Sequence, residues 1–242
     1  MYNDVMEKNY TYDYIAGSNI YLWQRKDMFR INTDTAQLAH FMQIKKGDRV
    51  LDIGTNNGAL LLYANQFEPS FLCGIDIQEE ACQLAEKNLK EHGITNAEII
   101  CSDFTQAAFE GFDVVISNPP FFQMGNHGKI EKNPRSIARH EIFLPLPQLL
   151  QGVRRALKEN GRLYMVHRSE RIVDIIEECR KNHLEIKTMQ FVFDERKPLA
   201  VSVLIEAVLG GSPLCQVPHP ILLRPDGTFL SYRSLDDFGS SK

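Results

Sequence analysis

The feature that most constrains this chain is a regular alternation of short apolar segments and amphipathic helical segments that begins at Arg49. The segment RVLDIG covers residues 49–54 and FLCGIDI covers 71–77, and helical periodicity follows each of them, over residues 59–66 and 79–92. Further apolar segments cover residues 97–103, 112–118 and 162–167. Short apolar runs alternating with helices predict a parallel sheet with helices on both faces.

The C-terminal half changes this pattern. After expected helices over residues 147–157 and 170–183, two strand-like segments cover 184–193 and 199–208, separated by the short turn DERKP. Such a pair predicts an antiparallel hairpin at one edge of the sheet. The expected fold is therefore α/β, a doubly wound, mostly parallel, seven-stranded sheet of Rossmann-like type with an antiparallel C-terminal edge hairpin.

The segments that flank this core predict the domain organisation. Residues 14–21 read as a hairpin with AGSN in the middle, and Thr33 or Asp34 is expected to cap a helix that runs to about Met42. We therefore expect an N-terminal hairpin and helix extension over 1–44, a core domain over 45–210, and a C-terminal extension and tail over 211–242.

Composition and charge exclude several classes of protein. The chain has 242 residues, 43% of them hydrophobic and 24% charged, with a net charge of -4, so it has no overall basic field to attract nucleic acid. We expect no signal peptide and no membrane span. The five cysteines show no CxxC spacing and the histidines form no ligand array, so we expect no metal site and buried, reduced thiols, as in a cytoplasmic protein.

The first core strand ends in the glycine-bearing loop DIGTNNG, which covers residues 52–58. Gly54 and Gly58 allow the backbone to approach a ligand closely, and Asn56 stands where a third glycine is usual. Asparagine tolerates the left-handed conformation better than most residues, so we expect the turn to survive. A strand, such a loop and a helix predict a nucleotide-type binding site.

Three acids, Asp52, Asp76 and Asp103, follow successive strands and should line one crevice. We expect Asp76 to bind ribose hydroxyls, Asp103 to accept from an adenine amino group, and Phe104 to pack on the base. Three carboxylates would repel the pyrophosphate of a dinucleotide, which argues against a dehydrogenase, but they suit the cationic sulfonium and ammonium groups of S-adenosylmethionine. In the alternative interpretation, Asp76 only caps the next helix, and Asp103 does the same.

The fourth strand leads into SNPPF, residues 117–121. The side-chain oxygen of Asn118 and the carbonyl of Pro119 can both accept hydrogen bonds from one planar NH2 group, and Phe121 offers a stacking surface for a flipped-out base. The proline ring restricts the backbone, so these acceptors would be preorganised. The expected catalytic residues are therefore Asn118, Pro119 and Phe121.

The stretch from Arg49 to Phe122 resembles the class I S-adenosylmethionine-dependent methyltransferases, and SNPPF resembles the NPPF/Y motif of those that methylate planar NH2 groups. Three more stretches, INTDTAQLAHF (31–41), NPRSIARHE (133–141) and VHRSERIVDII (166–176), resemble the bacterial methyltransferases that modify an anticodon-loop adenine at N6 in valine tRNA. The resemblance implies adenine N6 in tRNA as the acceptor and places Asp34 at the rim of the cofactor pocket.

Other acceptors remain open at this point. Guanine-N2 methyltransferases of rRNA and protein-glutamine methyltransferases share the same motif, and a noncatalytic RNA-binding module could keep the fold. The basic residues Lys132, Arg135 and Arg139 are candidate phosphate contacts, with a solvated surface as the alternative. Because the net charge is -4, tRNA binding requires such a local patch or a partner protein, and the sequence leaves the oligomeric state open.

Overall fold

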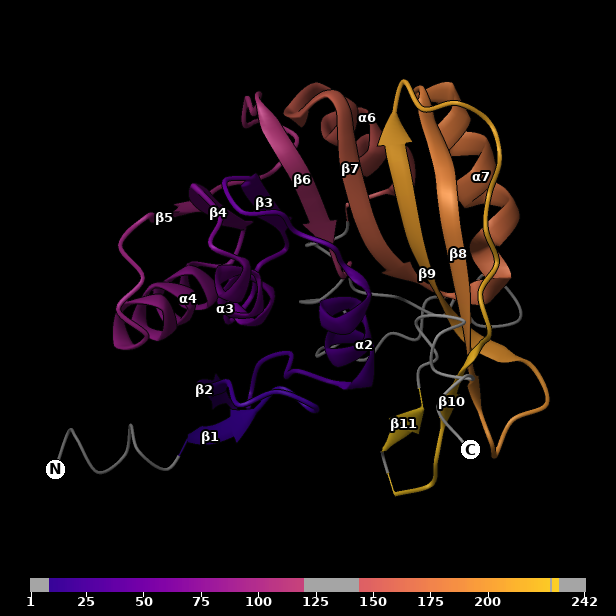
Figure 1. The fold of residues 1–242 in the computed structure, drawn as a ribbon. Helices are drawn as coiled ribbons and strands as arrows, with labels where there is room; N and C mark the ends of the chain where they lie inside the picture. Colours follow the sequence, from indigo (N-terminus) through magenta and orange to yellow (C-terminus); the bar gives the residue numbers. More distant parts are fainter. Residues whose placement is uncertain (1–8, 120–143, 227, 231–242) are drawn as a thin grey trace, which may run out of the picture.

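A computed structural model describes residues 9–119, 144–226 and 228–230 of the chain. Its centre is a sheet with the strand order β11-β10-β8-β9-β7-β6-β3-β4-β5 (Figure 1). The strands of the first half are β3 (Arg49–Ile53), β4 (Phe71–Asp76), β5 (Ala97–Cys101) and β6 (Phe112–Ser117). Those of the second half are β7 (Leu157–His167), β8 (Leu184–Asp194), β9 (Ala200–Leu209), β10 (Ile221–Leu223) and β11 (Phe229–Leu230).

The pairing confirms the predicted sheet. Strands β5, β4, β3, β6 and β7 pair in parallel, whereas β9 is antiparallel to both β7 and β8. The seven predicted strands correspond to β3 to β9. The sheet also contains two strands of the C-terminal segment that were not expected. Strand β10 pairs in parallel with β8, and β11 pairs antiparallel with β10. The β8–β9 pair therefore does not form the outer edge of the sheet.

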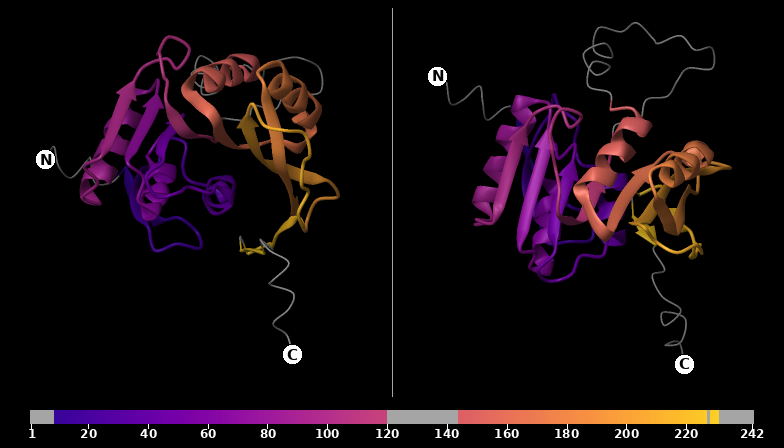
Figure 2. Two further views of the ribbon diagram at one scale, coloured as in Figure 1. Left: turned by 45° about the horizontal axis from the view of Figure 1, so that its top comes forward. Right: turned by 90° about the horizontal axis from the view of Figure 1, so that it is seen from above.

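Helices cover both faces of the sheet (Figure 2). One face packs against α2 (Thr33–Phe41), α3 (Ala59–Ala64) and Leu89 of α4 (Glu79–Glu91), whereas the other packs against α6 (Leu146–Ala156) and α7 (Ile172–Lys181). Neighbouring strand residues enter opposite cores, since Val50 belongs to the first core and Leu51 to the second. The parallel strands β3, β4, β6 and β7 therefore carry buried residues on both faces, whereas the edge strand β5 is only partly buried.

The predicted N-terminal hairpin is formed by β1 (Tyr10–Tyr14) and β2 (Tyr21–Arg25). The predicted caps of the next helix were wrong, because α2 begins at Thr33 and Asn32 is its cap, accepting a hydrogen bond from the Thr35 amide at 3.0 Å. The prediction of buried thiols holds only for Cys73, Cys82 and Cys179, since Cys101 and Cys215 are exposed. Cys101 ends the edge strand β5, and Cys215 lies in the chain between β9 and β10.

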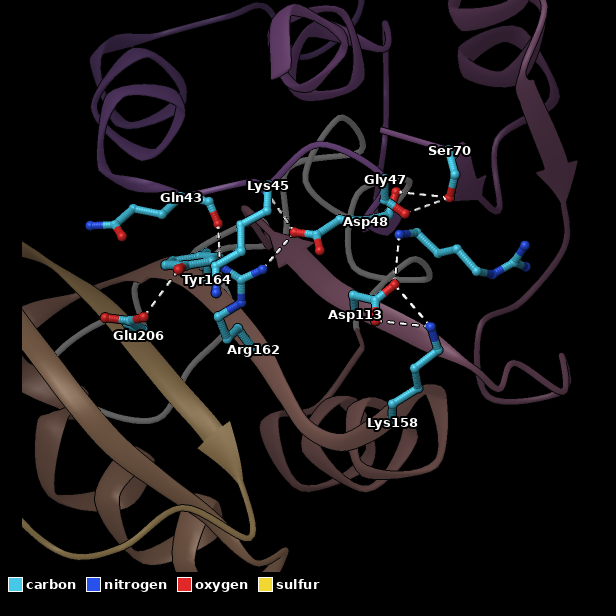
Figure 3. Close-up of polar contacts among 11 residues, drawn as sticks. Gln43, Lys45, Gly47, Asp48, Ser70, Asp113, Lys158, Arg162, Tyr164 and Glu206 are labelled. Carbon is cyan, nitrogen blue, oxygen red and sulfur yellow. Dashed lines mark hydrogen bonds and ion pairs between the residues drawn. The ribbon is translucent and has the colours of Figure 1, made fainter. Parts of the chain in front are cut away.

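A polar network ties the amino-terminal ends of the strands together (Figure 3). Arg162 of β7 donates to the carbonyl of Gln43 at 2.8 Å and pairs with Asp48. Asp113 of β6 accepts from the Arg49 amide and from Lys158. The loop before β3 is thus joined to β6 and β7 at the edge opposite the carboxyl ends of the parallel strands. Within the described ranges, no helix is long and apolar enough to cross a membrane.

Candidate functional site

A recess lies at the carboxyl edge of the sheet, between the loop after β3, the start of α2 and the end of β6. Its empty volume is about 320 Å³, part of it open to solvent. Parallel strands place their carboxyl ends at one edge, and this edge is where open α/β sheets bind ligands. The residues that line it are Phe29, Ile31, Thr35, Asp52, Gly54, Thr55, Asn56, Asn57, Ala59, Leu60 and Asn118.

The glycine-bearing loop turns as its sequence predicted. Gly54, Asn56 and Gly58 have φ values of 75°, 49° and 78°, so Asn56 does adopt the left-handed conformation expected of it. The amides of Gly54 and Thr55 both donate to the carbonyl of Ile75, at 2.9 and 3.0 Å. A Cβ at Gly54 would meet no atom within 4 Å, so this glycine serves its backbone conformation and leaves open space toward the recess.

Asp52 is the most unusual residue of the recess. It is 1% exposed, and neither carboxylate oxygen finds a hydrogen-bond partner among the residues that the structure describes. Burial raises the pKa of Asp52 to about 7, the Asp76 carboxylate adds to the rise, and the nearby Thr55 hydroxyl opposes it. The buried Thr55 hydroxyl lies close enough to Asp52 to lower its pKa as a donor, but it meets the geometry of a hydrogen bond with no group within the same ranges. Two buried polar groups at one site are therefore available to a ligand.

Asp76 ends β4 beside this loop. Its carboxylate accepts from the Asn56 amide at 2.9 Å and from the Gln78 amide at 3.0 Å. Burial raises the pKa of Asp76, and these hydrogen bonds oppose the rise. Each oxygen keeps a further lone pair for a donor such as a ribose hydroxyl. Asp76 is thus held by the loop, which makes its predicted role compatible with the geometry.

Asp103 and Phe104 lie beyond β5 and differ in their surroundings. Asp103 accepts from both the amide and the hydroxyl of Thr105, each at 2.8 Å. These bonds form a local turn and not the helix cap of the alternative interpretation, because no helix lies between β5 and β6. Phe104 is 7% exposed, stacks on Phe109 at 5.8 Å, and packs so closely on α6 that a Cβ at Gly152 would lie 2.3 Å from its ring. Their predicted contacts with an adenine remain predictions.

Asp34 lies on the first turn of α2 but does not line the recess. Its carboxylate accepts from the Ser202 hydroxyl of β9 at 3.1 Å. Burial raises the pKa of Asp34, whereas the charge of Arg168 and the bond from Ser202 lower it. Asp34 thus joins α2 to β9, while its neighbour Thr35 lines the recess. The place of Asp34 at the rim of a cofactor pocket stays a prediction.

Asn118 follows β6 and does line the recess. Its Nδ2 donates to the Thr35 hydroxyl at 3.0 Å, and Pro119 follows it, half-buried. Sequence reasoning missed Thr35, Asn57 and Phe29. The sequence did contain a signal for Thr35. In the NTDT stretch an asparagine stands three residues before a polar residue, which is a helix-cap pattern, and this pattern places Thr35 on the first turn of the helix.

The other predicted site residues, Phe121, Lys132, Arg135 and Arg139, lie outside the described residues. Within those ranges, no group of three or more His, Cys, Asp or Glu side chains could hold a metal ion.

The recess fits the cationic cofactor predicted from the sequence. Asp52 is a buried acid without a hydrogen-bond partner in the described chain, and the described residues that line the recess include no lysine or arginine. An anionic pyrophosphate would face this acid with no compensating cation, whereas a sulfonium or ammonium group would stabilise its ionised form. Residues that could hold such a group are Asp52, Thr55 and the loop from Gly54 to Gly58, with Asp76 beside them.

Comparison with known proteins adds an independent line of support. A family model described as a methyltransferase domain matches residues 44–203. A curated relative from Parabacteroides distasonis, named tRNA1(Val) (adenine(37)-N6)-methyltransferase, is 29% identical over 164 residues, which cover 65% of this chain and 68% of the relative. A relative of the same name from Bacteroides fragilis is 29% identical over 150 residues, and there the match spans 62% of the relative's length.

Solved structures support the fold. The crystal structure of a protein from Agrobacterium tumefaciens, described as a predicted O-methyltransferase, superimposes with a TM-score of 0.61. The match covers 81% of this chain and 89% of that one at 16% sequence identity. At this identity the likeness concerns the sheet and its helices, and the acceptor has to be inferred from the site.

Proposed function

The chain belongs to the methyltransferase domain family, as an enzyme that uses S-adenosylmethionine, and from this premise we propose that it methylates the exocyclic N6 amino group of adenine in tRNA. The observation that carries the proposal is the placement of Asn118, with its rigid neighbour Pro119, beside the recess that holds Asp52, a buried acid with no hydrogen-bond partner among the described residues. The names of the curated relatives support tRNA as the substrate class. This assignment places the protein in the cytoplasm.

The cofactor, when bound, supplies a methyl group on a cationic sulfur. The chain contributes binding and orientation: Asp52 and Asp76 attract the positive and hydroxyl groups of the cofactor, and the loop from Gly54 to Gly58 gives it space. The Oδ1 atom of Asn118 and the carbonyl of Pro119 accept hydrogen bonds from the acceptor amine. Two such acceptors favour a pyramidal nitrogen and direct its lone pair toward the recess. The rate then depends on alignment and not on a strong base.

The predicted residues outside the described ranges complete the proposal. We infer from the motif that Phe121 stacks on the acceptor base, and from their charge that Lys132, Arg135 and Arg139 contact phosphates of the tRNA. A partner protein that supplies further RNA affinity fits the net charge of -4.

The identity of the product tests the acceptor. Total tRNA, rRNA and a protein extract are each methylated in vitro with the purified chain and S-adenosylmethionine, and the methylated nucleosides and amino acids are mapped by mass spectrometry. N6-methyladenosine in a tRNA anticodon loop is the expected product. N2-methylguanosine in rRNA or methylglutamine in protein would replace this assignment with one of the rivals that share the motif, and failure to bind the cofactor in calorimetry would favour a noncatalytic RNA-binding module.

Asn118→Ala tests the role of the amide. It removes one of two acceptors, and we expect turnover to fall by about 100-fold or more while cofactor affinity changes little. The matched control is Asn96→Ala, since Asn96 donates to the Pro69 carbonyl outside the recess and should keep full turnover. Undiminished turnover of Asn118→Ala would disprove the assigned mechanism.

A further inference from the structure

A hydrogen bond joins the end of β6 to the start of α2 at the recess. The donor is Asn118 Nδ2 and the acceptor is Thr35 Oγ1, 3.0 Å away, although the two residues are 83 positions apart. Thr35 is 5% exposed, and both residues line the recess. The amide proposed to accept from the substrate amine is therefore held on its nitrogen side by a buried hydroxyl.

The cap of α2 determines the direction of this bond. Asn32 Oδ1 accepts from the Thr35 amide at 3.0 Å, so the oxygen of the Asn32 side chain faces the helix. The Thr35 hydroxyl donates its proton to the same oxygen at 3.2 Å. A hydroxyl has a single proton, so only lone pairs remain for Asn118, and an NH2 group has to meet them.

The reversed orientation of Asn118 is disfavoured for the same reason. With its oxygen toward Thr35, that amide would need the hydroxyl proton already donated to Asn32. Taking the proton would leave two acceptors, Thr35 Oγ1 and Asn32 Oδ1, facing each other at 3.2 Å. An unsatisfied buried acceptor is costly, so the network selects one orientation.

We propose that Asn32 and Thr35 form an orienting relay that holds the Asn118 carboxamide with its oxygen directed away from α2 and toward the acceptor amine. The inference rests on the proposed function in one respect, since it requires an acceptor with a planar NH2 group. Thr35 is a positioning residue in this scheme, because it acts on the substrate only through Asn118. The chain thereby uses a helix cap to determine which end of its amide faces the substrate.

Substitution of Thr35 separates this role from simple packing. Thr35→Val keeps the shape of the side chain but removes the hydroxyl, so the amide loses its orienting partner. We expect kcat to fall by roughly ten- to a hundredfold, with little change in KM for tRNA or in the affinity for S-adenosylmethionine. Thr35→Ser restores the hydroxyl and should recover most of the turnover. Thr188→Val is the matched control, because Thr188 lies on β8, away from the recess, and the substitution removes a part-buried hydroxyl that donates to Glu206 of β9.

A double variant tests whether the effect passes through the amide. If Thr35 acts only on Asn118, the variant Thr35→Val/Asn118→Ala should be no slower than Asn118→Ala alone. A multiplicative loss in the double variant would mean that Thr35 acts independently, and the relay would be disproved.

A spectroscopic measurement tests the relay without the tRNA substrate. In the NMR spectrum of the cofactor-bound protein, the Asn118 side-chain NH2 protons should show a nuclear Overhauser effect to the Thr35 methyl group, and their shift should change in Thr35→Val but not in Thr188→Val. Absence of this contact in the unsubstituted protein would overturn the relay. If instead the contact is present and tRNA is not methylated, the proposed acceptor fails while the relay stands.

Discussion

At the residue scale, Asp52 is the residue at which the cost of burying a charge in the folded protein has to be compared with the gain from binding a cationic ligand. A carboxylate that is 1% exposed and has no hydrogen-bond partner within the described chain costs folding free energy whenever it is ionised. A cationic ligand would recover that cost, which is a physical reason for keeping such a group in a binding recess. We therefore expect Asp52 to make the protein without cofactor less stable and to make the complex with the proposed cofactor tighter.

The pH dependence of Asp52→Asn follows from this argument. Burial raises the pKa of Asp52 from 3.8 to about 7. Between these values the folded protein keeps a proton that the unfolded chain loses, so this acid lowers the free energy of unfolding as the pH rises toward 7 and has no further effect above it. Asparagine does not titrate, so the stability of Asp52→Asn relative to the unsubstituted protein should increase by about 2–3 kcal/mol between pH 5 and pH 8.

Urea unfolding at the two pH values measures this difference. Asp226→Asn is the control, because its bonds from Thr228 lower the pKa of Asp226 below 3.8, and its titration is therefore complete below pH 5. A relative stability of Asp52→Asn that stays constant from pH 5 to pH 8 would show that Asp52 ionises normally. The same variant should bind S-adenosylmethionine more weakly, as calorimetry would show.

At the element scale, Asn88 adds three hydrogen bonds to the apolar contacts that Leu22 and its neighbours make between the N-terminal hairpin and the core. Asn88 of α4 is 1% exposed, accepts from the Trp23 amide at 2.9 Å, and donates to the carbonyls of Trp23 and Asn57 at 3.0 and 2.9 Å. It thus joins β2, α4 and the glycine-bearing loop. The sequence carried a signal for this role, because Asn88 interrupts the apolar stripe that Leu84, Ala85 and Leu89 form on the helix.

Asn88→Ala should loosen the hairpin. Three backbone groups lose their partner, so we expect a loss of about 2–3 kcal/mol in the free energy of unfolding. Hydrogen exchange should accelerate in β1 and β2 more than in β3 or β6. Gln83→Ala is the matched control on the same helix, since exposed Gln83 bonds only to Glu79 among the contacts described. Equal exchange in hairpin and sheet would argue that other contacts hold the hairpin.

Element types were predictable here because they depend on local periodicity, whereas several boundaries and partners were not. The helix expected over residues 147–157 is α6, Leu146–Ala156. Strand β10 could not be foreseen, because the three residues Ile221 to Leu223 carry too short a pattern and pair with β8 only once the hairpin is in place. Short strands depend on their neighbours for stability, and their neighbours are distant in the chain.

At the scale of the whole molecule, the two edges of the sheet have separate tasks. The carboxyl edge carries the recess with its partnerless acid, and the amino edge carries the polar network of Figure 3. Arg162 and Asp48 have side chains only 14% and 12% exposed, and their ion pair joins β7 to the loop before β3. Stability is thus supplied at the edge opposite the site.

Arg162→Met tests this separation. It keeps the apolar stem but leaves Asp48 without its cation, so we expect a loss of about 3 kcal/mol in the free energy of unfolding, measured in urea. Affinity for S-adenosylmethionine should stay unchanged in calorimetry. Arg180→Met removes an exposed arginine paired with Glu185 and should cost less than about 1 kcal/mol. A fall in cofactor affinity for Arg162→Met would show that the two edges are not independent.

The sequence by itself determined the alternation of strands and helices, the left-handed turn at Asn56, and the approach of Asp52, Asp76 and Asn118 to one edge. These follow from backbone periodicity and from the rule that parallel strands end together. Only the tertiary structure decided that Thr35 holds Asn118 and that Asp34 bonds to Ser202, 168 positions away. Such partners depend on how α2 packs over the end of the sheet, and no local pattern in the chain encodes which hydroxyl will lie within 3 Å of which amide.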